Sequence, residues 1–156
     1  MASSMIAPGT KVEDLVVHIS EEIHVNAPLD VTFDALLEQI GPSMTQSNDQ
    51  PMPMKVEPWP GGRWYRDLGD GSGHLWAHVQ SIKRPTLLEF SGPLMMSYPA
   101  ISNVQYRLSE HEGGTLIKFQ HLALGVILPQ HREGFPQGWK YINAHAKARA
   151  EAKQRK

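Results

Sequence analysis

The chain of 156 residues has no cysteine, no long hydrophobic run and almost no net charge. The absence of cysteine excludes disulfides and thiolate chemistry, and it favours a reducing compartment, which we take to be the cytoplasm. Because no run of about 18 apolar residues occurs, we expect no membrane-spanning helix. With 15 Lys and Arg against 16 Asp and Glu, the net charge of -1 gives no general attraction for nucleic acid.

The length of the chain fits one domain, because a core of this size is stable without disulfides or metals. We expect residues 13–150 to form this domain. Residues 1–12 are small and polar, and they lack the charged start and apolar centre of a signal peptide, so we predict a disordered segment. Residues 151–156 are predicted to be a basic C-terminal tail.

The first third of the chain predicts a strand, a helix and a loop. Apolar and polar residues alternate over residues 15–25, which is typical of a half-buried strand. Pro28 and Asp30 then mark the start of a helix, with Asp30 as its N-cap, and Gly41 ends it. Residues 43–53 are rich in Ser, Asn, Gln, Pro and Met, and we predict a mobile loop near the mouth of the fold.

The rest of the chain predicts six more strands and a closing helix. Hairpin turns are expected around Asp70 and Gly113, where glycine reaches positive φ easily. Residues 129–136 are predicted to be an irregular loop and residues 137–153 the last helix, which is apolar only near Trp139 and Ile142. The pattern favours an α+β domain. The predicted strands are residues 54–59, 63–68, 74–83, 87–91, 101–109 and 115–124.

Strand alternation indicates which side chains point inward. Phe119 and His121 share one face of the last strand, and Tyr106 and Phe90 lie on the apolar faces of two earlier strands. Such residues form either a solid core or the wall of a pocket. If they form a pocket, the residues expected to line it are Trp76, Phe90, Tyr106, Phe119, His121 and Trp139.

Three histidines, His74, His78 and His121, are the side chains in these strands that could transfer protons or bind a metal. His121, among apolar neighbours, is either a hydrogen-bonded core residue or a group that moves protons. His74 and His78 flank Trp76, so all three are expected on one face of a strand. Together with His121 they suggest a zinc site, but no motif supplies a fourth ligand, and we therefore assign no metal.

Other signs of catalysis are few. Glu57 and Glu89 are possible acid–base carboxylates if their strands turn them inward. No Gly-x-Ser-x-Gly elbow occurs, and the glycine-rich run near Asp70 opens no helix and lacks the Lys-Ser/Thr ending of a phosphate-binding loop. We therefore assign no catalytic residue and no cofactor.

Several motifs, in this order, resemble the SRPBCC superfamily, and in particular its branch named after the activator of the heat-shock-protein-90 ATPase. The motifs are a Gly-Gly bend before a Trp-containing strand, a Pro turn before an apolar strand, a Gly-Thr strand that ends in His, and a Gly-Trp at the last helix. They stand in the runs VEPWPGGRWYRDLGDGSGHLWAHVQSIKRPTLLEFSG, GGTLIKFQHLALG and QGWKY.

The resemblance implies a helix-grip fold, as in the birch-pollen allergen and START lipid-transfer domains. This fold has a β-α-α-β6-α order and a curved antiparallel sheet that wraps around a long C-terminal helix and a hydrophobic cavity. The chain departs from the pattern at residues 43–53, where the family has a second helix, and after Ile142, where the last helix has no leucine. Both departures affect the size and closure of the cavity.

Three functions remain open from the sequence. The leading hypothesis is a binder of a small hydrophobic or amphipathic ligand, such as a lipid or an aromatic metabolite, without catalysis. The second is a cyclase-like or hydrolase-like enzyme in which His121 moves protons. The third is an interaction module, either a co-chaperone that activates an ATPase or a homodimer. The superfamily contains several functions, so the fold alone does not choose among them.

Overall fold

The computed structural model describes residues 7–154, which form one antiparallel sheet of seven strands and two α-helices. Residues 1–6 of the predicted N-terminal segment and residues 155–156 of the predicted tail lie outside the described residues. The elements are, in chain order, the short 3-10 helix η1 (Val12–Leu15), β1 (Val16–Val25), α1 (Leu29–Ile40), β2 (Lys55–Val56), β3 (Arg63–Gly69), β4 (Ser72–Lys83), β5 (Leu87–Gly92), β6 (Ala100–His111), β7 (Gly114–Gly125) and α2 (Pro129–Gln154).

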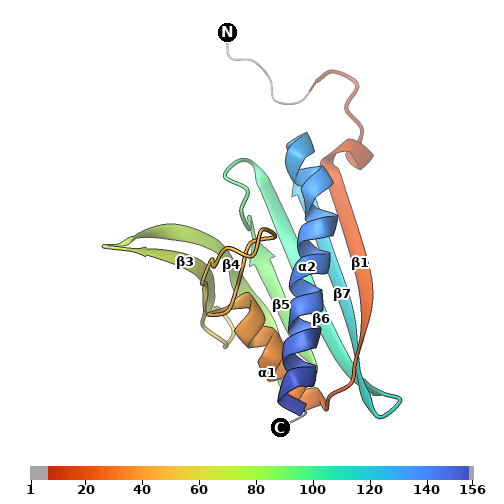
Figure 1. Ribbon diagram of the computed structural model, residues 1–156. Helices are drawn as coiled ribbons and strands as arrows, with labels where there is room; N and C mark the ends of the chain where they lie inside the picture. Colours follow the sequence, from red (N-terminus) through yellow and green to blue (C-terminus); the bar gives the residue numbers. More distant parts are fainter. Residues whose placement is uncertain (1–6, 155–156) are drawn as a thin grey trace.

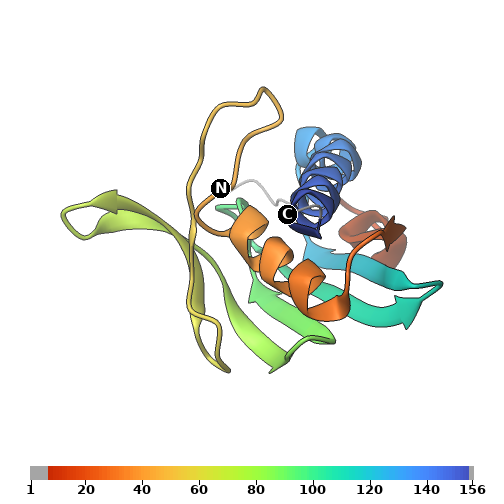
Figure 2. The ribbon, with the colours of Figure 1, turned by 60° about the horizontal axis from the view of Figure 1, so that its bottom comes forward.

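The strands follow the order β1-β7-β6-β5-β4-β3-β2, so the first strand lies at one edge beside the last. Figures 1 and 2 show both helices on the same face of a curved sheet, with the β3–β4 hairpin projecting away from them. Helix α2 runs along the sheet, and α1 packs against it. The predicted α+β helix-grip fold is confirmed.

Two hairpin turns set the register of the long strands. The turn between β3 and β4 has Asp70 and Gly71 at φ of 54° and 75°, and the turn between β6 and β7 has Glu112 and Gly113 at 48° and 81°. Two successive positive φ values match the right-handed twist of the flanking strands. The hairpins predicted around Asp70 and Gly113 are therefore confirmed.

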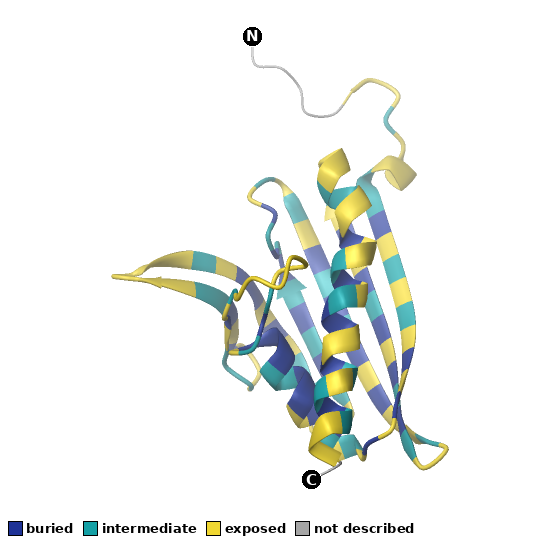
Figure 3. Cartoon of the chain, viewed as in Figure 1, coloured by how far each residue is buried: buried dark blue, intermediate teal, exposed yellow. Residues whose placement is uncertain are grey.

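The core lies between the concave face of the sheet and one stripe of α2, visible as the dark bands in Figure 3. Phe135, Trp139, Asn143, Ala146 and Ala150 belong to this stripe, spaced three or four residues apart. Large residues are buried near the start of α2 and alanines near its end, so the two parts of the helix fill the core differently. No helix within residues 7–154 has the length and apolarity needed to cross a membrane.

Two cations of α2 reach the edge strand β1. Arg132 donates from Nη1 to the backbone oxygen of Val16 at 2.8 Å, and Lys147 donates from Nζ to that of His24 at 2.6 Å. These contacts lie near opposite ends of β1. The helix is thereby held against the sheet edge along most of the length of the strand.

The prediction of a loop over residues 129–136 was wrong, because α2 begins at Pro129 and not at residue 137. Proline and glycine in this stretch favour a loop, and Pro136 inside the helix has no N–H to donate. Burial of Phe135 against the ring of His121, at 4.9 Å between centroids, offsets this cost. Proline at the first helical position is also well tolerated.

Two smaller predictions were wrong. Helix α1 begins at Leu29 with Pro28 as its N-cap residue, and Asp30 lies in the first turn, where its carboxylate complements the helix dipole. The predicted departure from the family pattern at residues 43–53 is confirmed, because this segment contains no second helix. The strand predicted over residues 54–59 is reduced to Lys55–Val56, because Pro58 cannot donate to a neighbouring strand.

Candidate functional site

A small apolar cavity of about 150 Å³ lies beside the first half of α2. Its wall comes from β4, the loop between β5 and β6, and one face of α2. The apolar side chains that line it are Trp76, Met95, Phe135, Trp139 and Ile142. A larger hollow of about 500 Å³ lies on the outer face of the sheet, but it is lined by charged side chains such as Glu22, Arg107 and Lys118. We therefore take the small cavity as the candidate site.

Trp76 forms one wall of the cavity and stands on an aromatic cluster. The Trp64 ring lies 5.2 Å from that of Trp76 and 4.7 Å from that of Phe90, measured between centroids. Phe90 is fully buried behind this wall and does not reach the cavity. The cluster fixes the indole of Trp76 from behind, since edge-to-face and offset rings pack without voids.

Trp139 forms the opposite wall and stands on a second cluster. Its ring lies 4.8 Å from that of Phe119, which in turn lies 4.9 Å from that of Tyr106. The Tyr106 hydroxyl donates to Oδ1 of Asn143 at 2.8 Å, and burial raises the pKa of this hydroxyl. Phe119 and Tyr106 are buried behind Trp139, so they support the wall from inside the core.

His121 is fully buried under the same wall, and both ring nitrogens have partners. The Trp139 indole N–H donates to Nδ1 at 2.9 Å, which leaves the proton of a neutral ring on Nε2, 2.8 Å from the Ser102 hydroxyl. Burial lowers the pKa of His121 to about 4. His121 therefore acts as a neutral link between α2, β6 and β7, with no nitrogen free for a ligand.

A second histidine, His131, lies at the rim of the cavity. Its Nδ1 lies 2.6 Å from the hydroxyl oxygen of Tyr98, and this oxygen also accepts the backbone N–H of Leu128 at 3.3 Å. The His131 ring lies nearly parallel to the rings of Tyr98 and Phe135, at 5.6 Å and 6.0 Å between centroids. This group fastens the β5–β6 loop to the first turn of α2.

The loop of residues 43–53 crosses to the middle of α2. The Tyr141 hydroxyl donates to the carboxylate of Asp49 and lies 3.0 Å from the hydroxyl of Thr45. The hydrogen bond to Asp49 raises the pKa of Tyr141. Met44 and Met54 at the two ends of the loop are buried in the core. The loop is thus a strap that is bonded to α2 next to Ile142 of the cavity wall.

The possible acid–base carboxylates lie away from the cavity. Glu57 receives two side-chain N–H groups and one backbone N–H from Arg63, and the side-chain bonds lower the pKa of Glu57 to about 2. Glu89 accepts from Asn103 and Gln105 at 3.0 Å and 2.6 Å. Both carboxylates serve as hydrogen-bond acceptors for neighbouring strands.

The expectation that His74, Trp76 and His78 share one strand face was wrong. A register shift in β4 pairs His78 with Arg63 and His74 with Arg66, while the residues between them lose strict alternation. Trp76 is buried, His74 is half-buried and His78 is exposed. Within residues 7–154 no group of three or more His, Cys, Asp or Glu side chains is placed to hold a metal ion.

Of the residues predicted to line a pocket, Trp76 and Trp139 border the cavity, while Phe90, Tyr106, Phe119 and His121 lie behind its walls. Sequence analysis missed the other lining residues. Those on α2 follow one helical face, at the spacing of His131, Phe135, Trp139 and Ile142. The prolines and glycines between them concealed this spacing.

Gly134 and Gly138 also border the cavity, on the same face of α2. A Cβ added at either glycine meets no atom within 4 Å, and neither has a positive φ. These glycines therefore are not required by the backbone or by close packing. Their effect is to leave space beside the helix where any other residue would place a side chain.

The sequence profile of the family described as "Activator of Hsp90 ATPase homolog 1-like protein" matches residues 26–150. No curated protein matches the chain. An uncharacterized protein from Rhizobium leguminosarum has a similar structure, with a TM-score of 0.67 at 19% identity, over 88% of this chain and 95% of that one.

Two further solved structures have the same shape. Ara h 8.0201 gives a TM-score of 0.64 at 13% identity, over 88% of this chain and 99% of that one. The di-domain ARO/CYC StfQ from the steffimycin biosynthetic pathway gives 0.62 at 15% identity, over 92% of this chain and 53% of that one. At such identities the likeness shows the fold alone.

Proposed function

This chain belongs to the family of Activator of Hsp90 ATPase homolog 1-like proteins, and from that premise we propose that it binds a small apolar or amphipathic molecule. The observation that supports the proposal is the apolar cavity between Trp76 and Trp139. Two buried aromatic clusters hold its walls in place, and ligand pockets are commonly apolar and formed in advance in this way.

The volume of the cavity limits the ligand. An apolar cavity of about 150 Å³ engineered in another protein stays dry and accepts benzene. The cavity here has the same volume, about 150 Å³, so its occupant has an apolar part of roughly one six-membered ring or a short alkyl chain. A longer lipid chain requires the strap of residues 43–53 or the start of α2 to move.

The geometry does not favour the enzymatic alternative. Proton transfer by His121 requires a ring nitrogen within reach of the substrate, whereas both nitrogens are bonded to Trp139 and Ser102. An interaction role of the kind that the family description names, a homodimer and a location in the cytoplasm stay predictions.

The proposal is tested by filling the cavity from Gly138. In Gly138→Leu the added Cβ meets no atom within 4 Å, so we expect the variant to keep the fold and to lose the volume for a ligand. The matched control is Ala144→Leu, which adds a similar side chain on an exposed position of the same helix. Indole serves as the neutral probe, and isothermal titration calorimetry measures its binding.

Wild type and Ala144→Leu are expected to bind indole with the same affinity, and Gly138→Leu is expected to lose the binding. Native mass spectrometry of protein purified from its own source then identifies the natural occupant. Equal binding by Gly138→Leu and wild type contradicts the assignment of the site.

A further inference from the structure

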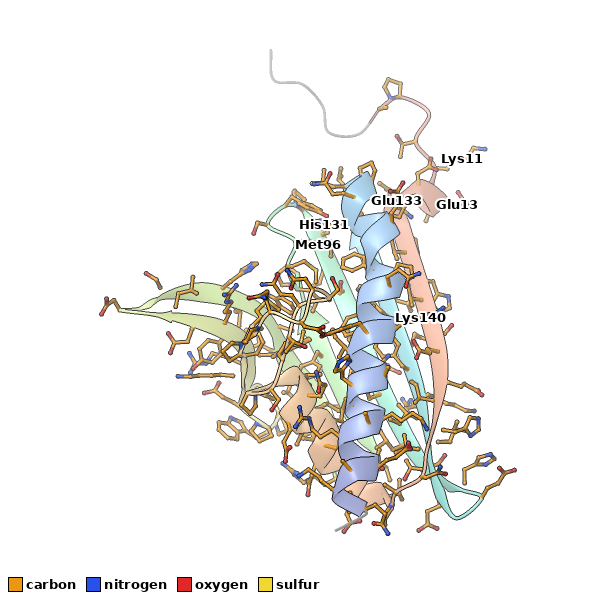
Figure 4. The ribbon with its side chains drawn as sticks, viewed as in Figure 1. Lys11, Glu13, Met96, His131, Glu133 and Lys140 are labelled. Carbon is orange, nitrogen blue, oxygen red and sulfur yellow. The ribbon has the colours of Figure 1, made fainter. Side chains whose placement is uncertain are left out.

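The rim of the proposed cavity carries a polar group whose second nitrogen has no partner. His131 lies at the third position of α2, and Figure 4 shows it on the side of the helix that faces the β5–β6 loop. Its Nδ1 is bonded to Tyr98, and Nε2 makes no hydrogen bond or ion pair to any residue within 7–154. His131 is half-buried and lines the cavity.

Hydrogen-bond counting fixes the direction of the Tyr98–His131 bond. The backbone N–H of Leu128 can only donate, so it uses one lone pair of the Tyr98 oxygen. If Nδ1 of His131 also donated, the Tyr98 proton would have no acceptor among the described residues. The Tyr98 hydroxyl and Nδ1 are both satisfied when Tyr98 donates to Nδ1, and the neutral imidazole then carries its proton on Nε2, the one donor of this pair without an acceptor among residues 7–154.

The surroundings of this N–H favour a negative partner. The first turn of α2 contains no acidic residue, so the partial positive charge of the helix N-terminus is not compensated there. Glu133 lies on the side of α2 turned away from His131 (Figure 4).

We propose that the occupant of the cavity is an amphipathic acid, with an apolar part of about one ring between Trp76 and Trp139 and a carboxylate that accepts the Nε2–H of His131. This inference rests on the proposed function and adds the chemical class of the ligand. The hydrogen bond to Tyr98 and the contact with the Phe135 ring keep the donor in place before the ligand arrives, which lowers the entropy that binding costs.

The test uses three probes of similar size: phenylacetate, its neutral isostere phenylacetamide, and toluene. Isothermal titration calorimetry measures binding to wild type and to His131→Phe, which keeps a ring between Tyr98 and Phe135 but has no donor. The control is His145→Phe, the same change at an exposed position of α2 outside the cavity. His131→Gln restores an N–H donor without the imidazole.

Wild type is expected to bind phenylacetate about tenfold or more tightly than phenylacetamide, as is typical of one hydrogen bond to a charged group. His131→Phe is expected to lose this preference, His131→Gln to regain part of it, and His145→Phe to keep all of it. Toluene is expected to bind all four proteins alike.

Two outcomes separate the inference from the proposed function. If toluene binds but wild type does not prefer the acid, or if His131→Phe keeps the preference, the acid assignment is wrong and the cavity remains a ligand site. If none of the three probes binds wild type, the cavity takes no ligand of this size and both proposals fall. The wild-type comparison needs no variant, so a folding defect in His131→Phe leaves it valid.

Discussion

The two halves of α2 are one continuous helix but are built from different residues. Residues 129–138 contain Gly134, Pro136 and Gly138 and border the cavity. Residues 139–154 are rich in alanine and in charged residues, and beyond Trp139 and Ile142, which also line the cavity, they lie over the closed core. Alanine, lysine and arginine favour helix strongly, while glycine and proline disfavour it by about 1 and 3 kcal/mol. The first half is therefore helical because of its tertiary contacts. The second half is helical both because of such contacts and because its residues have a high intrinsic preference for helix.

This difference suggests where the molecule opens. A segment whose helical structure depends on a few side-chain contacts unfolds locally at lower cost than one with strong intrinsic preference. Phe135 and the Tyr98–His131 group hold the first half, and the strap meets α2 just beyond it, at Tyr141. A ligand is thus expected to enter beside residues 129–138 while residues 139–154 stay packed on α1.

The largest effect is expected at the junction of the two halves, in Trp139→Ala. The variant removes a buried aromatic side chain and leaves Nδ1 of His121 without its donor, so the free energy of unfolding should fall by about 3–5 kcal/mol. Urea denaturation followed by circular dichroism measures it. Trp59→Ala is the control, because Trp59 is 54% exposed and should change stability by no more than about 0.5 kcal/mol. Equal losses contradict the role of Trp139.

The stability that the buried His121 contributes beneath Trp139 should depend on pH. The pKa of His121 is about 4 in the folded protein against 6.5 for the free side chain, so between these values the unfolded chain binds more protons. The resulting stability is fully present above pH 6.5 and is lost as the pH falls toward 4, by about 3 kcal/mol.

Urea denaturation of wild type and His121→Gln at several pH values between 4 and 7 tests this prediction. All other titrating groups are common to the two proteins, so the difference between their pH profiles isolates His121. The free energy of unfolding of the variant should fall less toward pH 4 than that of wild type. Parallel profiles mean that His121 is not held neutral by burial.

Introducing leucine should change the free energy of unfolding in opposite directions in the two halves. Ala146→Leu adds volume at a buried position of the second half and should lower the free energy of unfolding by about 1–3 kcal/mol. Gly138→Leu adds it in the open space of the first half and should raise stability by up to about 1 kcal/mol through helix preference. Melting curves of both variants measure the contrast. If both variants are less stable than wild type, the first half has no free space for the leucine side chain.

The smallest effect is expected for Gly134→Ala. The added methyl group meets no atom within 4 Å, and alanine favours helix over glycine by about 0.5–1 kcal/mol. The variant should be more stable than wild type but should bind toluene more weakly, because the methyl group narrows the cavity. Thermal melting and calorimetry measure the two properties. A gain in stability with unchanged binding indicates that Gly134 lies too far from the ligand.

The sequence predicted the sheet better than the site. Alternating residues and two glycine turns were enough to find the long strands, because each depends on local preferences that neighbouring residues reinforce. The register shift near Trp76 depends on pairing with β3, and no local pattern reveals it. That shift decided which of Trp76, His74 and His78 faces the core.

The site was only partly predictable for a similar reason. Trp76 and Trp139 could be named because large aromatics are expected to be inside, but His131 and Phe135 lay in a segment predicted as a loop. Their spacing fits a helix, but a segment that contains Pro136 forms a helix only because it packs against the sheet, and this contact is not visible in the local sequence. Whether an inward residue borders a space or fills it depends on rotamers and volumes that periodicity does not contain.

The contacts of Arg132 and Lys147 with β1 also bear on aggregation. A free edge strand offers its backbone to any other chain that can add a strand, which is a common route to misassembly. Here two cations of α2 already occupy carbonyl oxygens near both ends of that edge, at Val16 and His24. A chain that adds to β1 must displace them and then place its own backbone beside two positive charges. The closing helix therefore protects the sheet from uncontrolled growth as well as covering its core.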